Sequence, residues 1–274
     1  MSEPQTEEAP ELSFVLPSYN EARRLPRTLE RVAAYFDATL PSAEIIVVDD
    51  GSSDETSRVA RETLVGRAGA QVVTFPQNRG KGAAVRAGVL AARGRRVLFS
   101  DADLSTPIEE EARLRAALDR GADVAIGSRA EPDSRVTLPQ GTARQSMGRT
   151  FNVLVRLLGL TSFRDTQCGF KMFTREAAQA IFPTARLDGF AFDVEVLYVA
   201  ERAGFRVVAV PVEWKNDPVS RVRMVRDPVR MILELLRIRL RYPPWGARGT
   251  IRAVSASRSS SATERSRESS GGPP

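Results

Sequence analysis

Short apolar runs alternate with longer amphipathic stretches along the first half of the chain. The apolar runs are rich in β-branched residues and lie at 14–16, 45–48, 72–73, 97–99 and 124–126, a pattern typical of buried strands. After the first run, apolar residues recur every three or four positions, at Leu25, Leu29, Val32, Phe36 and Leu40, which predicts a helix with one apolar stripe. Strands that alternate with helices predict an α/β fold with a mostly parallel sheet.

Two helix starts carry capping patterns. Ser52 precedes Glu55 by three positions, which predicts a capping box, and Thr106 and Glu109 repeat that spacing. Pro107 follows Thr106, so we expect it at the first position of the next helix. Both patterns come directly after acidic strand ends.

The second half of the chain is less regular. We expect helices over 140–160 and 192–203, a loop and strand over 165–173, and a strand over 207–212. The last amphipathic stretch, 229–242, predicts a helix with charged residues on one line, at Arg230, Glu234, Arg237 and Arg241. Such a helix suits either docking onto the core or lying at a membrane surface.

The ends of the chain are predicted to lie outside the folded domain. Residues 1–11 are acidic and lack the basic start and apolar segment of a secretory signal. Residues 246–274 are rich in Ser, Arg and Gly, which predicts a disordered tail. No run approaches the roughly 18 apolar residues of a membrane span. We therefore expect one domain over 12–245, in a cytoplasmic protein that is soluble or peripheral to a membrane.

Composition narrows the possible chemistry. The 274 residues are 42% hydrophobic, enough for a large core, and include no His. This excludes His bases, Ser-His and Cys-His nucleophile pairs and imidazole zinc sites. A single cysteine, Cys168, excludes an intrachain disulfide. The net charge of +6 favours anionic partners, and only three of the 40 cationic residues are Lys. Arginine suits bidentate phosphate contacts, although an arginine-rich coding bias would produce the same count.

Polar residues collect where three of the expected strands end, at 17–21, 49–52 and 100–103. In an open α/β sheet, ligands bind outside the carboxyl ends of the strands. Asp101 and Asp103 are spaced so that a turn can direct both carboxylates at one hard divalent cation. The alternative is that these aspartates only cap the following turn or helix.

The motifs at these strand ends occur in a specific order. V-V-D-D-G-S-S-D at 47–54, N-R-G-K-G at 78–82 and D-A-D at 101–103 resemble family 2 inverting glycosyltransferases of the GT-A fold. R-D-T-Q-C-G-F-K-M-F-T-R at 164–175 and F-D-V-E-V-L-Y-V-A at 192–200 resemble the dolichyl-phosphate β-glucosyltransferase branch. The resemblance extends over 12–242. It implies a Rossmann-like, mostly parallel sheet flanked by helices, with a nucleotide-sugar half at 12–130 and an acceptor half at 131–245.

The resemblance also implies a donor site. The nucleotide pocket would be lined by Pro17, Tyr19 and Glu21, and Asp50 would bond to the base or ribose. Lys81, between two glycines that permit close backbone approach, would balance phosphate charge.

By the same resemblance, Asp101, Ala102 and Asp103 would meet the donor diphosphate, with Asp101 and Asp103 binding Mg²⁺ or Mn²⁺. Related mannosyl-phosphate-dolichol synthases have Gln two positions after the second Asp, where this chain has Ser105. The third metal ligand is therefore open between Ser105 and a water.

For the acceptor phosphate, the resemblance implies Arg129, Arg144 and Arg221, with Arg135 and Arg223 as substitutes. Gln167 and Asp165 are expected to contact the sugar, and Cys168 to be a packed side chain rather than a reactive thiol.

Asp193 and Glu195 lie where many family 2 enzymes place the catalytic base. A phosphate monoester has a second pKa of about 6, so such an acceptor is already nucleophilic at neutral pH. Asp193 is therefore expected either to act at the reaction centre, by orienting or as a base, or to cap the helix that follows it.

Together these motifs predict a metal-dependent, inverting transferase that moves glucose from UDP-glucose to a polyprenyl phosphate, giving a β-linked product at the cytoplasmic face of a membrane. The alternative donor is GDP-mannose, and the alternative class is a non-catalytic nucleotide-binding scaffold. Nucleic-acid binding is disfavoured, because aromatic residues make up only 7% of the chain and no nucleic-acid motif is present.

Overall fold

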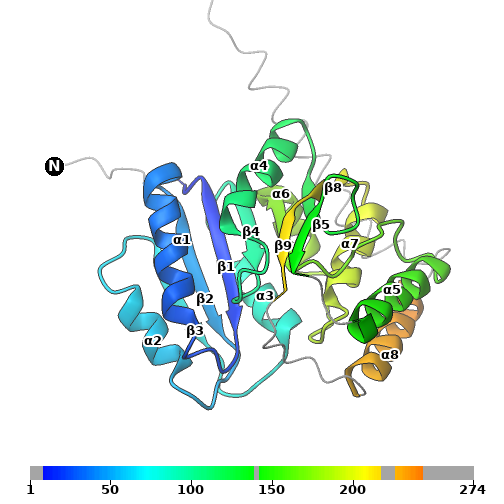
Figure 1. The fold of residues 1–274 in the computed structure, drawn as a ribbon, viewed down its shortest axis with the longest axis horizontal. Coiled ribbons are helices and arrows are strands. Elements are labelled where there is room, and N and C mark those ends of the chain that lie inside the picture. The colour runs from blue at the N-terminus through cyan, green and yellow to red at the C-terminus, as the bar shows by residue number, and fades with distance from the viewer. Residues whose placement is uncertain (1–8, 139–141, 217–225, 243–274) are drawn as a thin grey trace, which may run out of the picture.

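A seven-stranded sheet forms the centre of the molecule in the computed structural model, which describes residues 9–138, 142–216 and 226–242 (Figure 1). The strand order is β3-β2-β1-β4-β7-β5-β8, and β7 runs antiparallel to both neighbours while the other pairs are parallel. The strands of this sheet are β1 (Leu12–Ser18), β2 (Glu44–Asp49), β3 (Ala70–Thr74), β4 (Arg96–Ser100), β5 (Val124–Ser128), β7 (Phe170–Thr174) and β8 (Val207–Pro211). A separate two-stranded sheet pairs β6 (Arg135–Leu138) with β9 (Glu213–Lys215).

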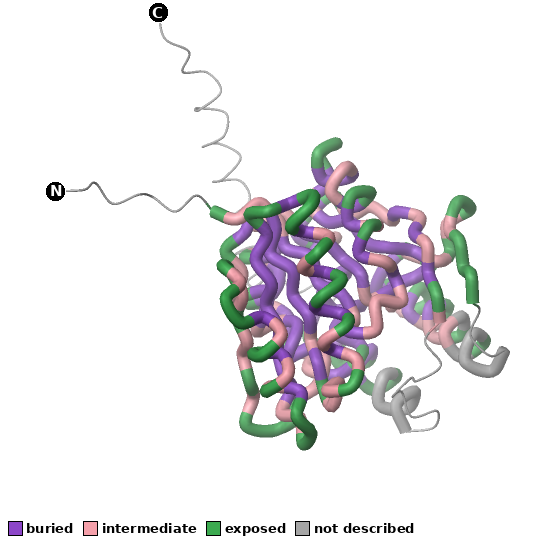
Figure 2. The backbone as a smooth tube through the Cα atoms, turned by 60° about the vertical axis from the view of Figure 1, so that its left-hand side comes forward, coloured by how far each residue is buried: buried purple, intermediate pink, exposed green. Residues whose placement is uncertain are grey.

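Helices cover both faces of the main sheet, so its strands β1, β2, β4, β5 and β7 are almost entirely buried (Figure 2). Successive strand residues point to opposite faces: Phe14 packs in the cluster with α1, α2 and α4, whereas Val15 packs with α3, α6 and α7. The helices are α1 (Leu25–Thr39), α2 (Thr56–Thr63), α3 (Lys81–Ala91), the 3₁₀ helix η1 (Ile108–Glu110), α4 (Glu111–Asp119), α5 (Thr142–Leu157), α6 (Arg175–Ile181), α7 (Phe192–Arg202) and α8 (Arg226–Arg241).

The expected strands of the main sheet and the helices over 25–40, 140–160 and 192–203 are confirmed, with small differences at their ends. The short elements β6, β9 and α6 were not predicted. All four residues of β6 are exposed, so it lacks the buried alternation that reveals a strand. Pro10 and Glu11, at the end of the segment expected to be disordered, bond to the strand region instead: Arg95 N–H donates to Pro10 O at 2.8 Å and Arg96 Nη1 to Glu11 Oε1 at 3.0 Å.

Both capping predictions are wrong in detail. α2 begins at Thr56 with no side-chain cap, because the Ser52 hydroxyl bonds to Asp49 and accepts the Asn20 N–H at 2.8 Å. Pro107 is the N-cap of η1 rather than its first residue. The Thr106 hydroxyl lies 3.7 Å from the Cys168 sulfur. These polar side chains join the loops at the strand ends instead of capping helices.

Helix α8 packs against α5 and α7, and α5 and α8 lie side by side at the lower right of Figure 1. The line of charged residues expected on α8 is not one exposed face, since Glu234 is 2% exposed and accepts the Ala191 N–H at 3.2 Å. Within the described ranges, no helix has the length and apolar character needed to cross a bilayer. The expected tail at 246–274 lies outside the described residues.

Candidate active site

The three polar strand ends meet at one edge of the sheet, as predicted. β1 and β2 are parallel with Ser18 beside Asp49, and the Asp50 N–H donates to Ser18 O at 2.8 Å. β4 is the other neighbour of β1, so the turn that carries Asp101 and Asp103 follows at the same edge. The parallel arrangement therefore brings together residues that are some fifty positions apart along the chain.

Asp50 holds the loop that precedes α3. Its buried carboxylate accepts bonds from Asn78 Nδ2 at 2.9 Å, Arg79 N at 2.7 Å and Gly80 N at 2.8 Å. Burial raises the pKa of Asp50 above its ordinary value, although the two backbone N–H groups oppose this shift. This positioning role was not predicted, and the expected contact of Asp50 with the base or ribose stays a prediction.

Lys81 begins α3 and points at the acidic turn. Its Nζ lies 2.6 Å from Asp101 Oδ1, and its side chain is 19% exposed. Burial lowers the pKa of Lys81, but the charges of Asp101, Asp193 and Asp103 outweigh burial and hold that pKa above its ordinary value. Lys81 therefore remains an ammonium ion.

The backbone on both sides of Lys81 is tightly packed. The Gly82 N–H donates to Asp188 O at 2.8 Å. A Cβ at Gly80, whose φ is +111°, would lie 2.3 Å from that same oxygen. Glycine is therefore required at position 80 for both its conformation and its close approach. The N-R-G-K-G motif thus fixes where the Lys81 side chain starts.

Asp101 and Asp103 form a turn at the end of β4. Leu104, with φ 45°, donates its N–H to Asp101 O at 3.1 Å, and the Ser105 N–H donates to Asp103 Oδ1 at 2.9 Å. Burial and the charge of Asp101 raise the pKa of Asp103. Arg24 Nη1 lies 3.9 Å from Asp103 Oδ2. Asp103 therefore caps its turn, which was the alternative to a metal-binding role. It also lies close enough to Asp101 for the two charges to interact.

This pair suits a divalent metal. The side chains of Asp101 and Asp103 are 38% and 27% exposed, so both are accessible. No group of three or more acidic, Cys or His side chains suited to a metal occurs in the part of the chain that the structure describes. Mg²⁺ typically binds through one or two carboxylates together with substrate phosphates. The site therefore fits a metal that binds with a diphosphate.

A buried ion pair lies behind this turn. Lys171, on β7, is fully buried, and its Nζ donates to Asp193 Oδ1 at 2.5 Å and Cys168 O at 2.6 Å. Burial raises the pKa of Asp193, which Lys171 and Lys81 oppose. Asp193 does not cap α7, whose N-cap is Ala191. Sequence reasoning missed Lys171, although a lone cation within the apolar run F-K-M-F was a usable signal.

Two residues with separate predicted roles are paired with each other. Arg129 Nε and Nη2 donate to the Asp165 carboxylate at 2.7 Å and 2.8 Å, and Asp165 is 5% exposed. Burial opposes ionisation of Asp165, but Arg129 and Lys171 hold its pKa below the ordinary value. Arg129 also lies over the Trp214 ring, 5.2 Å from its centroid. The expected contacts of Arg129 with phosphate and of Asp165 with sugar stay predictions.

Of the other predicted acceptor arginines, only Arg135 has a described side chain. Arg144 lies in the first turn of α5, and its side chain is not among those described. Arg221 and Arg223 lie outside the described residues. Arg135 is exposed on β6.

The remaining predicted residues lie around the same edge. Tyr19 is 39% exposed, and the Glu21 N–H donates to Thr56 Oγ1 at 2.7 Å. Pro17 is half-buried, Ala102 O accepts the Thr28 hydroxyl at 2.8 Å, and Gln167 Nε2 donates to Phe190 O at 3.5 Å. Cys168 is buried, and burial raises the pKa of its thiol to about 11, in agreement with its predicted packing role.

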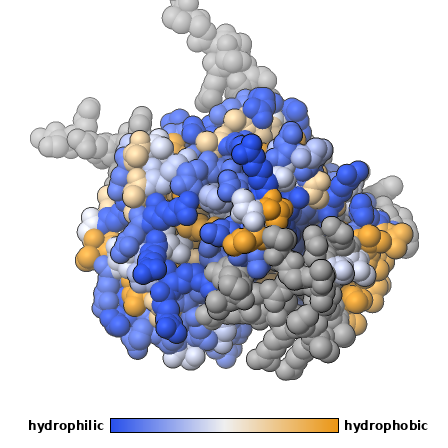
Figure 3. Space-filling model, in the orientation of Figure 1, coloured by the Kyte–Doolittle hydropathy of each residue, from blue (hydrophilic) through white to orange (hydrophobic). Residues whose placement is uncertain are grey.

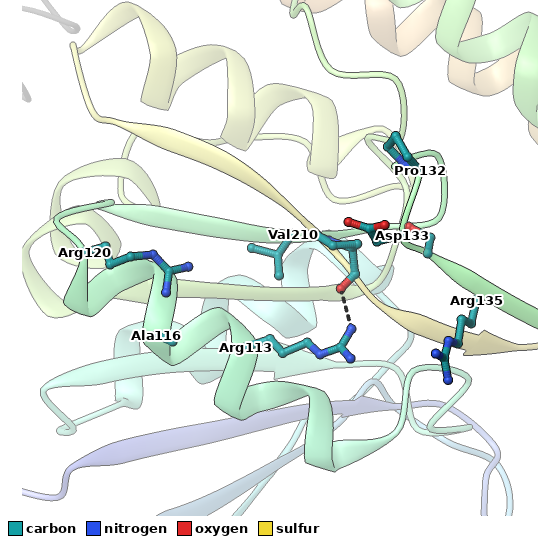
Figure 4. A pocket seen from close by; sticks show the side chains of 9 residues that line it. Arg113, Ala116, Arg120, Pro132, Asp133, Arg135 and Val210 are labelled. Atoms are coloured by element: carbon teal, nitrogen blue, oxygen red, sulfur yellow. Dashed lines mark hydrogen bonds between the residues drawn. The ribbon is translucent and has the colours of Figure 1, made fainter.

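A groove of about 750 Å³ lies elsewhere, between α4 and the edge strand β8 (Figure 4). Its lining includes Arg113, Arg120 and Arg135, and Arg113 donates to Pro211 O at 3.2 Å. Among the predicted site residues only the substitute Arg135 contributes, so this groove is separate from the acidic turn.

The fold is that of known glycosyltransferases. Mannosyl-3-phosphoglycerate synthase from Rubrobacter xylanophilus superposes with a TM-score of 0.62 at 23% identity, over 87% of this chain and 76% of that one. Glucosyl-3-phosphoglycerate synthase from Mycobacterium tuberculosis in complex with UDP gives 0.61 at 20% identity, over 84% and 80%. The architecture is therefore the GT-A fold, as predicted.

Sequence comparison places the chain within this class. Residues 13–182 match the model of glycosyl transferase family 2. The human dolichyl-phosphate beta-glucosyltransferase is 36% identical over 245 residues, which cover 85% of this chain and 76% of the human protein. Its Drosophila melanogaster counterpart is 38% identical over 254 residues, covering 87% and 78%. The chain belongs to glycosyl transferase family 2 and is a glycosyltransferase.

Proposed function

We propose that this enzyme transfers glucose from UDP-glucose to a polyprenyl phosphate of the dolichyl type, with inversion to a β-linked product. The observation that carries the proposal is the accessible Asp101–Asp103 pair with Lys81 beside it at the carboxyl edge of the sheet. The similarity to dolichyl-phosphate beta-glucosyltransferases over most of the chain supports the choice of donor and acceptor.

Asp101 and Asp103 would hold Mg²⁺ or Mn²⁺, which neutralises charge on a departing nucleoside diphosphate when it is bound. A structure of the M. tuberculosis glucosyl-3-phosphoglycerate synthase that contains Mn²⁺ and UDP, with a TM-score of 0.57 to this chain at 20% identity over 82% of it, supports a metal in this fold. Ser105 donates its backbone N–H to Asp103, and whether its side chain or a water completes the ligand set remains part of the proposal.

The other groups of the site would bind and orient. Lys81 supplies a permanent positive charge for the diphosphate, and Asp50 keeps the 78–80 loop in place. Pro17, Tyr19, Glu21 and Gln167 would complete the donor pocket.

The acceptor phosphate needs no strong base, because its second pKa is about 6. Asp193 is already bonded to Lys171 at 2.5 Å, which favours an orienting role over proton abstraction. A single in-line displacement by the phosphate oxygen then inverts the anomeric centre. Arg129, Arg144 and Arg221 would receive the acceptor phosphate, and Arg129 would then share its charge between that phosphate and Asp165.

We also infer that α5 and α8 rest on the cytoplasmic surface of a membrane. Helix α8 is held to the core by Leu235 and Ile238, whereas Leu240 on its other face is 80% exposed and Leu157 on α5 is 79% exposed. Apolar side chains gather on the right of Figure 3, over the end of the molecule that these helices occupy. Exposed Arg237 and Arg241 on α8 complement anionic lipids. The polyprenyl acceptor would lie in this membrane.

The activity test is transfer of radiolabelled sugar into an organic-extractable polyprenyl phosphate, from UDP-glucose and in parallel from GDP-mannose. We expect labelling from UDP-glucose that requires Mg²⁺ or Mn²⁺ and is lost with a chelator and in Asp103→Asn. Labelling from GDP-mannose alone would overturn the donor, and labelling from neither would overturn the proposed transfer.

The membrane test is co-sedimentation with phosphatidylcholine vesicles that contain about 30% phosphatidylglycerol. The Leu157→Ser/Leu240→Ser double variant should sediment less than the wild type. Val65→Ser is the matched control, because Val65 is 82% exposed but follows α2 at the other end of the sheet. Equal sedimentation of the double variant and the wild type would contradict the assignment of this surface.

A further inference from the structure

The Asp101 carboxylate, whose side chain is 38% exposed, already pairs with a cation. Its Oδ1 is bonded to Lys81 Nζ at 2.6 Å. Gly169 packs against the same carboxylate, since a Cβ at Gly169 would lie 2.2 Å from Asp101 Oδ2 and 2.6 Å from Asp101 Oδ1. The Asp101 N–H also donates to Gly169 O at 3.0 Å, which holds the two segments together. A metal ion that binds Asp101 therefore competes with the Lys81 ammonium ion for this carboxylate.

The neighbouring charges leave Lys81 with Asp101 as its close anionic partner. Asp193, the other carboxylate on this side, is bonded to Lys171 at 2.5 Å, and Lys171 is fully buried. Lys81 lies 5.8 Å from the centroid of the Phe192 ring, a contact that does not replace an ion pair. Asp103 has Arg24 at 3.9 Å, too far for a hydrogen bond. Of these two carboxylates, Asp101 is thus the one that is paired with a cation at hydrogen-bond distance.

The backbone of Lys81 is fixed by Gly80 and Gly82, but its four-carbon side chain can turn towards another anion. The diphosphate of a donor provides such an anion at the same edge of the sheet, and charge-assisted bonds to phosphate are strong. When the ammonium turns to the phosphate, Asp101 Oδ1 becomes available to a cation.

We propose that Lys81 exchanges partners when the donor binds: it occupies Asp101 in the free enzyme and passes to the diphosphate, so that the divalent metal gains Asp101 only together with the nucleotide. This inference rests on the proposed donor and metal site and adds an order to their binding. It makes Lys81 an internal competitor of the metal as well as a donor ligand. Removing Lys81 should therefore strengthen metal binding and weaken nucleotide binding, which are opposite effects.

The first experiment measures Mn²⁺ binding to the full chain without nucleotide, from the electron paramagnetic resonance signal of free Mn²⁺. Lys81→Met should bind Mn²⁺ about tenfold or more tightly than the wild type, because it frees a carboxylate oxygen. Lys81→Arg keeps the charge and should stay close to the wild type. In chelator, UDP binding measured by calorimetry should weaken in Lys81→Met.

Arg24→Met is the matched control. It also removes one positive charge beside the acidic turn, but Arg24 does not occupy a carboxylate oxygen of this pair at bonding distance. Its Mn²⁺ affinity should rise by less than about threefold, as expected for screened charges near a surface. An equal rise in Arg24→Met and Lys81→Met would show a general field effect and overturn the exchange.

Asp101→Asn provides a second test from the other partner. With its anion removed, Lys81 is available to phosphate, so UDP should bind more tightly in chelator while Mn²⁺ binding is lost. Unchanged or weaker metal binding in a folded Lys81→Met variant overturns the exchange, and so does unchanged or weaker UDP binding in Asp101→Asn. If the wild type binds no Mn²⁺ even with UDP, the proposed metal site itself fails, and the exchange with it.

Discussion

Lys171→Met tests the buried ion pair behind the site. The substitution keeps an unbranched chain of similar length but leaves Asp193, which is 3% exposed, without its partner at 2.5 Å. Removing one member of a buried pair typically costs about 3–5 kcal/mol, because the other charge stays buried and uncompensated. The carbonyl of Cys168 also loses its 2.6 Å donor. We expect the free energy of unfolding to fall by about 3 kcal/mol or more.

The assay is equilibrium unfolding in urea, followed by circular dichroism, with Lys171→Met, Asp193→Leu and the double variant measured together. Each single variant should be strongly destabilised. The double variant should recover most of the loss, since replacing both charges by apolar groups is often neutral. A loss below about 1 kcal/mol in Lys171→Met would refute this reasoning, because it would mean that the pair is solvated or relaxes at little cost.

The double variant also decides the role of Asp193. General bases contribute about 10²- to 10⁴-fold to a rate. If Asp193 is only the counterion of Lys171, the folded double variant should retain transfer within about tenfold of the wild type. A loss of about 10²-fold or more with stability recovered would show that Asp193 acts on the reacting groups.

Three further predictions follow from burial and backbone geometry. Because burial raises the pKa of Cys168 to about 11, iodoacetamide at a pH of about 8 should modify it slowly in the folded protein and rapidly in denaturant; rapid modification of the folded protein would contradict its packing. Gly80→Ala should cost about 1–3 kcal/mol, more than Gly66→Ala, because both glycines have positive φ but only at Gly80 would the added Cβ lie 2.3 Å from a backbone oxygen. Burial raises the pKa of Glu195, so the folded state binds this proton more tightly and the contribution of Glu195 to stability falls as pH rises from about 4.3 through its folded pKa. Glu195→Gln should flatten that part of the stability profile, and an unchanged profile would contradict the shift.

The order of strands and helices could be predicted from the sequence because the main sheet is buried on both faces. Runs such as 45–48 and 97–99 are therefore apolar at every position and do not alternate with polar residues. Together with their β-branched residues, this indicates buried strands. The antiparallel placement of β7 between β4 and β5 could not be predicted in this way, because apolar content does not record strand direction. The pair β6 and β9 was missed since its stability depends on partners far apart in the chain.

The placement of the candidate site was predictable where its residues lie close together in sequence, as in D-A-D and N-R-G-K-G. Ion pairs between side chains that lie far apart in the sequence were not predictable. Arg129 and Asp165 were assigned to phosphate and sugar separately, yet they meet at 2.7 Å because the end of β5 adjoins the loop before β7. Arginine and aspartate can each bind a substrate group or pair with an opposite charge. Only the tertiary structure therefore reveals that Arg129 and Asp165 bond to each other.

Given the proposed donor, the pairing of charges also gives a physical reason for a metal. Lys81 and Lys171 are matched by Asp101 and Asp193 at 2.6 Å and 2.5 Å, so these two lysines add no net charge, and Asp103 adds a negative one. The proposed nucleotide diphosphate would bring about two more negative charges to the same edge of the sheet. If Lys81 turns to the phosphate, the net charge of the site stays the same, and Asp101 loses its ion-pair partner. A divalent cation bound by the carboxylates together with the phosphates would supply the missing charge.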